Sequence, residues 1–237
     1  MTLELLTTFF ILTGLEIILG IDNIIFIAIV VQTLPAKIRD KARLMGIGLA
    51  LVMRLCLLAA VGWIMTLTAP LFGIGPLEFS AKDILMLLGG LFLIVQATRH
   101  IHSEIDPDDN PHAPKQKPQG FKSAILQILF VDAVFSMDSL LSAIGLTEHI
   151  VVIAAAIIIS IGVMVWLSKP IISLIERQPT LKVLALSFVM LIGVMMVAES
   201  TGYHIPRGYL YFAMAFSAGI EALNIKIRSR KKAMNKA

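Results

Sequence analysis

Four acidic residues lie within two apolar stretches of this sequence, in a pattern that occurs twice. In each copy, an acid is followed six residues later by an aspartate and then by a small polar residue. The members are Glu16, Asp22 and Asn23 in the first copy and Asp132, Asp138 and Ser139 in the second. An ionised acid at the centre of a membrane helix costs about 2.5 to 3.5 kcal/mol on insertion scales. We therefore expect these acids to face protein, water or a cation instead of lipid.

The six side chains of the two copies form a set of hard oxygen donors. Carboxylate, amide and hydroxyl oxygens suit manganese, magnesium or calcium and suit copper or zinc poorly. We predict that all six bind a metal ion, that the ion is transported, and that no cofactor is held permanently. A symmetric pair of acidic motifs could neutralise a divalent cation or exchange it for protons.

The spacing within each copy sets a geometric problem. Six residues turn an ideal helix by about 600°, which leaves the two acids of a pair about 240° apart. Bringing both acids to one site would require a break or a wide turn in the helix. We expect such a break near Gly20 in the first copy and near Ser136 in the second.

Composition indicates an integral membrane protein. Of the 237 residues, 57% are hydrophobic, and the mean hydropathy is +0.87. The apolar stretches run continuously, whereas strands of a membrane barrel alternate apolar and polar residues. We predict an all-α, polytopic membrane bundle of seven transmembrane helices. The predicted spans are 3–31, 44–68, 82–98, 121–147, 150–168, 181–200 and 208–225.

The duplicated motif extends to a duplication of three helices. A segment that begins at Gly90 aligns with one that begins at Gly193, in the third and sixth spans. An odd number of crossings per copy inverts the second copy, and inverted repeats place their sites near the bilayer midplane. We predict one transmembrane domain, 1–225, followed by a basic tail, 226–237. Its parts are a first repeat (1–98), a loop (99–120), a second repeat (121–200) and an extra helix (208–225).

The basic residues predict the orientation. Seventeen of the 20 Lys and Arg residues fall on one side of the seven predicted spans, while Lys82 and Arg207 fall on the other and Arg54 lies within a span. The positive-inside rule then places the N-terminus outside and the C-terminus in the cytoplasm. We expect a multi-pass protein of a bacterial-type inner (plasma) membrane. The expected partners are the metal ion, possible protons and the lipid bilayer; nucleic acid is not expected, and the oligomeric state is left open.

Three other interpretations compete with a transporter. In the first, Arg54 pairs with one acid and the remaining acids hydrogen bond within the bundle, serving only its structure. In the second, Asp22 and Asp138 form the dyad of an intramembrane enzyme, but the Gly-x-Gly-Asp context of that chemistry is absent, so we expect no enzyme. In the third, the protein is a membrane scaffold or insertion factor whose acids anchor partner helices.

The segments LEIILGIDNIIFIAIV, KDILMLLGGLFLIVQATRHIH and DAVFSMDSLLSAIGL together resemble the TerC family of integral membrane proteins, in its short form. The resemblance implies seven helices related to the LysE-type exporter superfamily, with manganese export as the expected activity. It also implies that the ion site includes Glu16, Asp22, Asn23, Asp132, Asp138 and Ser139. It does not decide between manganese, calcium and another cation, or a proton-coupled substrate.

Overall fold

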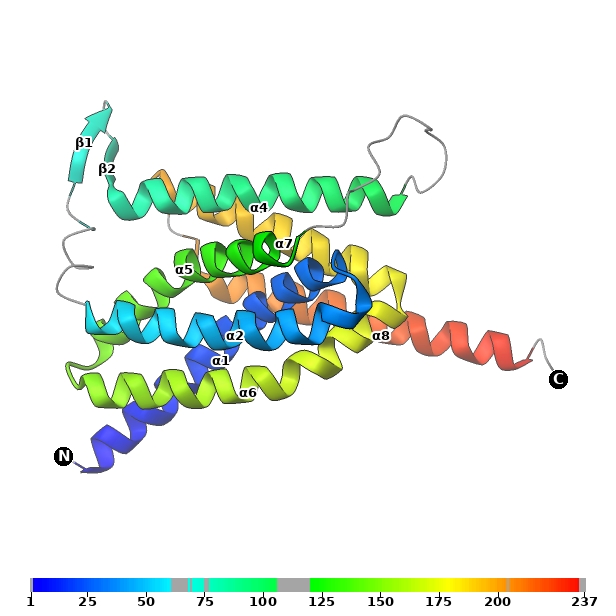
Figure 1. Ribbon diagram of the computed structural model, residues 1–237, viewed down its shortest axis with the longest axis horizontal. Coiled ribbons are helices and arrows are strands. Elements are labelled where there is room, and N and C mark those ends of the chain that lie inside the picture. Colours follow the sequence, from blue (N-terminus) through cyan, green and yellow to red (C-terminus); the bar gives the residue numbers. More distant parts are fainter. Residues whose placement is uncertain are drawn as a thin grey trace.

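The computed structural model describes residues 2–60, 68, 70–74, 77–105, 120–203 and 205–234. Seven of its helices are long and apolar enough to cross a membrane. The predicted fold class, an all-α bundle of seven transmembrane helices, is thereby confirmed. Figure 1 shows these helices lying side by side along one common direction.

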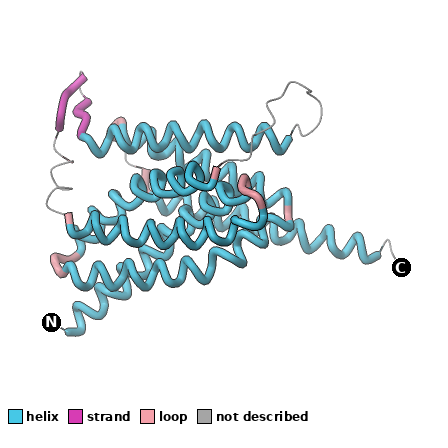
Figure 2. Tube along the Cα trace, in the orientation of Figure 1, coloured by secondary structure: helices cyan, strands magenta, loops and turns pink. Residues whose placement is uncertain are grey.

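The described elements are seven helices and two short strands. The helices are α1 (Thr2–Gln32), α2 (Ala36–Ala59), α4 (Ala81–Ile105), α5 (Phe121–Leu146), α6 (Ile150–Arg177), α7 (Pro179–Ser200) and α8 (Arg207–Met234). Two short strands, β1 (Pro70–Ile74) and β2 (Leu77–Ser80), pair antiparallel before α4. Figure 2 shows this hairpin at one end of the bundle; it was not predicted from the sequence.

Several helices extend beyond the predicted apolar spans. Helix α2 begins directly after Pro35 and so includes the basic segment 37–43, which was predicted to be a connection. Helix α4 continues to Ile105, into the predicted loop, and α6 continues to Arg177. Charged residues at the end of a membrane helix reach water without ending the helix, because their backbone hydrogen bonds stay within it. The remainder of the predicted loop, 106–119, lies outside the described residues.

The helices are arranged as two inverted sets of three. Helices α1 and α5 run in opposite directions, as do α2 and α6, and α4 and α7 (Figure 1). Helix α1 packs on α6, and its counterpart α5 packs on α2; α4 packs on α7. The first helix of each set thus packs on the second helix of the other set, and the two third helices pack on each other. This exchange is expected of a pseudo-two-fold arrangement. The two ends of the chain lie at opposite ends of the bundle (Figure 1), as an odd number of crossings requires.

The closest contact between the two sets is made by backbone. A Cβ atom added at Gly90 of α4 would lie 2.6 Å from the carbonyl oxygen of Gly193 in α7. A Cβ atom added at Gly193 would lie 2.8 Å from the carbonyl oxygen of Gly90. These glycines begin the aligned segments of the third and sixth spans, so equivalent positions of the two aligned segments meet here.

We expect Gly90→Ala to lower the free energy of unfolding by about 1 to 3 kcal/mol, because the added methyl group overlaps a backbone carbonyl that cannot move alone. The measurement is the thermal unfolding midpoint of the purified protein in detergent. Gly162→Ala is the matched control, since a Cβ atom there meets nothing within 4 Å. Equal midpoints for the two variants would show that α4 and α7 accommodate the added methyl group without loss of stability.

Candidate ion site

Arg54 of α2 joins the first acids of the two sequence copies. Its Nη1 donates to Glu16 Oε2 at 2.8 Å, and its Nη2 donates to Asp132 Oδ1 at 2.6 Å. Its Nε also donates to Asp132 Oδ2, at 3.2 Å, so Asp132 is held by two parallel hydrogen bonds. All three residues are buried. The guanidinium therefore compensates two carboxylates from two different helices.

Small polar side chains complete this first cluster. Asn23 Nδ2 donates to Asp132 Oδ1 at 3.0 Å, which links the first sequence copy to the second. Ser136 Oγ lies 3.2 Å from Asp132 Oδ2 and donates to the Asp132 carbonyl, while Ser139 lies beside the Glu16 carboxylate. The structure thus brings four of the six predicted residues together: Glu16, Asn23, Asp132 and Ser139.

Asp138 lies in a second cluster with two bases. Lys82 Nζ, on the first turn of α4, donates to Asp138 Oδ1 at 3.0 Å. Arg207 Nη2, at the first residue of α8, donates to Asp138 Oδ2 at 2.6 Å. The three side chains keep about a quarter of their surface exposed, at 27%, 23% and 25% for Asp138, Lys82 and Arg207. This cluster is therefore more accessible than the first.

Asp22 is buried, and one of its oxygens is left over. Asp22 Oδ1 has no hydrogen-bond partner in the described part of the chain, although the charge of Arg207 acts on this carboxylate. Asn23 Oδ1, on the next residue, is buried and equally without a donor. Buried acceptor oxygens without donors are rare in folded proteins and call for an explanation such as an ion or a water molecule.

The charges of the two clusters do not cancel. Glu16, Asp22, Asp132 and Asp138 carry four formal negative charges, whereas Arg54, Lys82 and Arg207 carry three positive ones. Glu199 adds a further negative charge that acts on Arg207. The described site thus has an excess of negative charge inside a low-dielectric bundle, where it attracts cations.

The prediction of broken helices is wrong. Helices α1 and α5 run without interruption through Gly20 and Ser136. Gly20 serves close packing instead, since a Cβ atom there would lie 2.7 Å from Met164 Sδ. The two acids of each copy therefore stay on different helix faces, as ideal helical geometry requires, and bases from α2, α4 and α8 compensate three of the four.

The sequence prediction missed the part that bases play in this site. Arg54 was considered as a partner for one acid but pairs with two, and Lys82 and Arg207 were assigned to the outer connections. The sequence did contain a signal for this role. Seventeen basic residues were assigned to one side of the membrane, and Lys82 and Arg207 were the two basic residues assigned to the other. Within the described ranges, no group of three or more His, Cys, Asp or Glu side chains is arranged to hold a metal ion.

A cavity of about 410 Å³ connects the two clusters. It lies between α1, α5 and α8. Its polar lining consists of Glu16, Asp138, Ser139, Ser142, Arg207 and Tyr211. Part of its lining comes from the last turns of α5 and the first turn of α8. These parts of α5 and α8 lie at the same end of the bundle as the start of α1 (Figure 1). An ion in this cavity would meet acids from both sequence copies.

The opposite half of the bundle is closed by apolar packing and ion pairs. Residues 24–31 of α1 are all buried. Beyond them, Arg39 of α2 pairs with Glu176 of α6 at 2.9 Å, and Arg43 donates to Ser168 of α6 at 2.7 Å. A cavity of about 270 Å³ beside these residues includes none of the predicted site residues in its lining.

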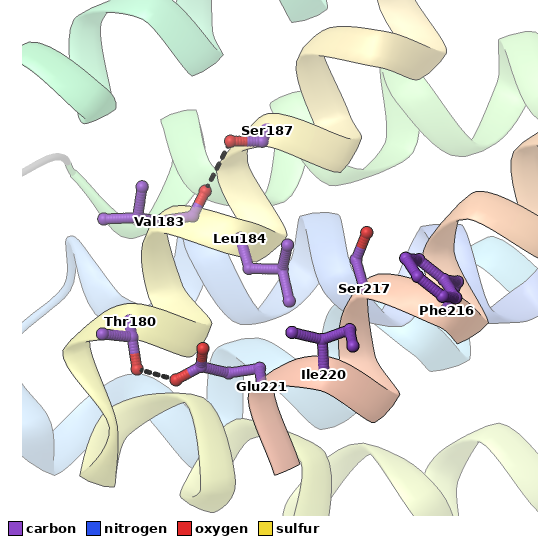
Figure 3. A pocket seen from close by; sticks show the side chains of 8 residues that line it. All are labelled: Thr180, Val183, Leu184, Ser187, Phe216, Ser217, Ile220 and Glu221. Atoms are coloured by element: carbon purple, nitrogen blue, oxygen red, sulfur yellow. Dashed lines mark hydrogen bonds between the residues drawn. The ribbon is translucent and has the colours of Figure 1, made fainter. Parts of the chain in front are cut away.

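A further cavity, of about 380 Å³, lies between α7 and α8 and is shown in Figure 3. Its only acid is Glu221, which accepts a hydrogen bond from Thr180. The other labelled side chains are mostly apolar (Figure 3). This cavity contains none of the predicted ion-site residues, so it does not contribute to the site.

We expect Arg54→Gln to cost about 3 to 5 kcal/mol in stability, because it leaves two buried carboxylates without a counter-charge. The triple variant Arg54→Gln, Glu16→Gln, Asp132→Asn removes the charges together and should recover most of that loss. Thermal unfolding in detergent measures both. Arg39→Gln is the control, since its exposed pair with Glu176 contributes at most about 1 kcal/mol. A triple variant no more stable than the single one would refute the charge argument.

Comparison with known proteins places the chain in a family. The family described as "Integral membrane protein TerC family" matches residues 1–236. "UPF0053 inner membrane protein YgdQ" of Escherichia coli (strain K12) is 47% identical over 220 residues, covering 93% of this chain and 92% of that protein. A "UPF0053 protein" of Haemophilus influenzae is 44% identical over 217 residues, with 92% of each chain covered. "UPF0053 inner membrane protein YoaE" of Escherichia coli (strain K12) is 46% identical over 213 residues, which are 90% of this chain but 41% of that protein. No solved structure matches. The chain belongs to the TerC family of integral membrane proteins.

Proposed function

We propose that this protein is a transporter of a hard divalent cation, with manganese export as its leading activity. One observation carries the proposal: among the described residues, no donor reaches one oxygen of the buried Asp22 or one of the buried Asn23, in a site with excess negative charge. A cation supplies both the missing ligand interaction and the missing charge. Relatives named as inner membrane proteins are consistent with such a role.

The proposed site uses the six residues of the duplicated motif. Glu16, Asn23, Asp132 and Ser139 already lie around Arg54, whereas Asp22 and Asp138 share the charge of Arg207. Hard oxygen donors favour manganese, calcium or magnesium, and the donor set alone does not choose among them. Manganese and the outward direction come from the family resemblance.

Alternating access through the two inverted repeats would carry the ion. The cavity reaches the acids from the half of the bundle that contains the N-terminus, while the Arg39–Glu176 pair lies across the other half. With the orientation that the positive-inside rule gives, the cavity faces outward and the closed half faces the cytoplasm. Rocking of one repeat against the other would open the closed half.

Export is tested in manganese-stressed bacterial cells that lack their own manganese exporters. We expect the native chain to lower intracellular manganese, and Asp22→Asn and Asp138→Asn to leave it at the level of cells without the protein. The asparagines keep the shape of the side chain and remove the charge that a dication requires. Elemental analysis at matched membrane expression measures the ion content.

Glu148→Gln is the control for this experiment, because Glu148 is an exposed acid between α5 and α6 and does not line any of the three cavities. It should export like the native chain. Equal manganese in cells with the native chain, with the variants and without the protein would remove manganese export from the leading position. Calcium would then be measured in the same cells.

A scaffold or insertion factor is the second candidate function, and the ion pairs favour it. Three of the four acids are already compensated by bases, so the clusters could serve the bundle alone. The two functions differ in whether the folded protein binds an ion.

We expect manganese to stabilise the purified native protein in detergent, by about 2.7 kcal/mol at a hundredfold excess over Kd. Asp138→Asn should abolish most of this shift, since it removes a ligand charge. The thermal unfolding midpoint with and without manganese measures it, and a potassium series at equal ionic strength controls for screening. A native protein that manganese, magnesium and calcium all leave unshifted would favour the scaffold.

A further inference from the structure

We propose that Arg207 is a tethered cation: its guanidinium occupies Asp138 in the absence of the transported ion, and the ion must displace it to bind. The inference rests on the proposed function and deepens it. It assigns a role in the transport cycle to α8, the helix outside the two repeats.

The position of Arg207 fits this role. Its Nη2 lies 2.6 Å from Asp138 Oδ2, and its charge also acts on Asp22. The charge of one base therefore acts on the second acid of both sequence copies. Arg207 also lines the cavity that reaches Glu16 and Asp138. An ion that arrives through this cavity meets the guanidinium at the carboxylate.

The two arginines of the site differ in how firmly they are held. Arg54 is 2% exposed, and it donates three hydrogen bonds to two acids from the middle of a packed helix. Arg207 is the first residue of α8, and a quarter of its side chain is exposed. Moving Arg207 therefore breaks fewer buried interactions than moving Arg54.

Helix α8 is also the least buried of the seven spanning helices. Its main packing partner is α7, and only 11% of its most apolar stretch of 18 residues is buried. The segment before it contains Gly202 with φ +87° and Pro206, so its connection to α7 is turned sharply at a glycine. Tyr209, Phe212 and Phe216, near the start of α8, are exposed. A shift of α8 would therefore cost little internal packing.

The exchange of cations explains why a divalent ion would be favoured. A monovalent ion at Asp138 would bring the same charge as the guanidinium without its directed hydrogen bonds. A divalent ion brings twice that charge to the Asp138 carboxylate. When the guanidinium returns to Asp138, it replaces part of the charge of the departing ion and promotes release.

The competition predicts an increase in affinity when the competitor is removed. We expect Arg207→Gln to bind manganese roughly tenfold more tightly than the native chain, because the guanidinium that competes with the ion for Asp138 is gone. Arg207→Lys keeps a tethered charge and should bind with near-native affinity. Isothermal titration calorimetry with manganese chloride on the purified full chain measures the Kd.

A second measurement needs no manganese. In a Cys56→Ser background, Ala143→Cys places a thiol on the buried lining of the cavity. We expect a water-soluble thiol reagent to modify it roughly fivefold faster when Arg207 is also changed to Gln, the scale on which a partly exposed ion pair shifts an equilibrium.

The outcomes separate the two proposals. Manganese binding by the native chain with equal or weaker binding by Arg207→Gln would overturn the tethered cation and leave the transporter standing. No manganese binding by any variant would overturn manganese as the substrate and the inference that rests on it. Lys122→Gln, which changes an exposed base on the first turn of α5 outside the cavity lining, should alter neither the Kd nor the rate of modification.

Discussion

The whole bundle depends on compensating carboxylates that are buried among apolar helices. A buried carboxylate loses several kcal/mol of hydration, and the loss is recovered only when a counter-charge and hydrogen bonds meet it with good geometry. Arg54 provides both for Glu16 and Asp132, and in doing so it fixes α1, α2 and α5 relative to one another. The same requirement brings Lys82 and Arg207 to Asp138 from the starts of two other helices. Ion pairs of the site thus involve five of the spanning helices: α1, α2, α4, α5 and α8.

The inverted arrangement determines which acids meet. Because α1 and α5 cross in opposite directions, the end of each motif lies beside the start of the other: Asn23 donates to Asp132, and Ser139 lies beside Glu16. Arg54 joins the two first acids, Glu16 and Asp132, across this crossing. The first cluster therefore contains one acid from each repeat and not the two acids of one helix. The cavity lined by Glu16 and Asp138 joins the two clusters across the repeat interface. A duplicated sequence has thereby produced a site that belongs to both copies at once.

The sequence predicted what depends on local pattern and missed what depends on long side chains. Seven spans, their order and the duplicated acids follow from apolar runs and fixed spacing, which are properties of single helices. Helix ends were misplaced where basic side chains such as Arg39 and Arg177 continue a helix past its apolar run. The expected breaks at Gly20 and Ser136 were wrong because the acids were assumed to need one another, whereas Arg54 satisfies two of them from a third helix. The roles of Lys82 and Arg207 could not be read from spacing, since each crosses between helices that are far apart in the chain. The metal-binding role of the six motif residues stays a prediction.

The contact of Gly90 with Gly193 has a mechanical consequence. Two helix backbones that touch without intervening side chains have no rotamers to rearrange. Sliding along this contact would therefore drive a carbonyl of one helix into the backbone of the other. The contact tolerates rotation far better than translation, in the manner of a pivot. If α4 and α7 turn about it, displacement grows with distance from the pivot, so that small angular changes there become larger movements at both ends of the bundle. The position of these glycines along α4 and α7 would then determine how far each end of the bundle moves.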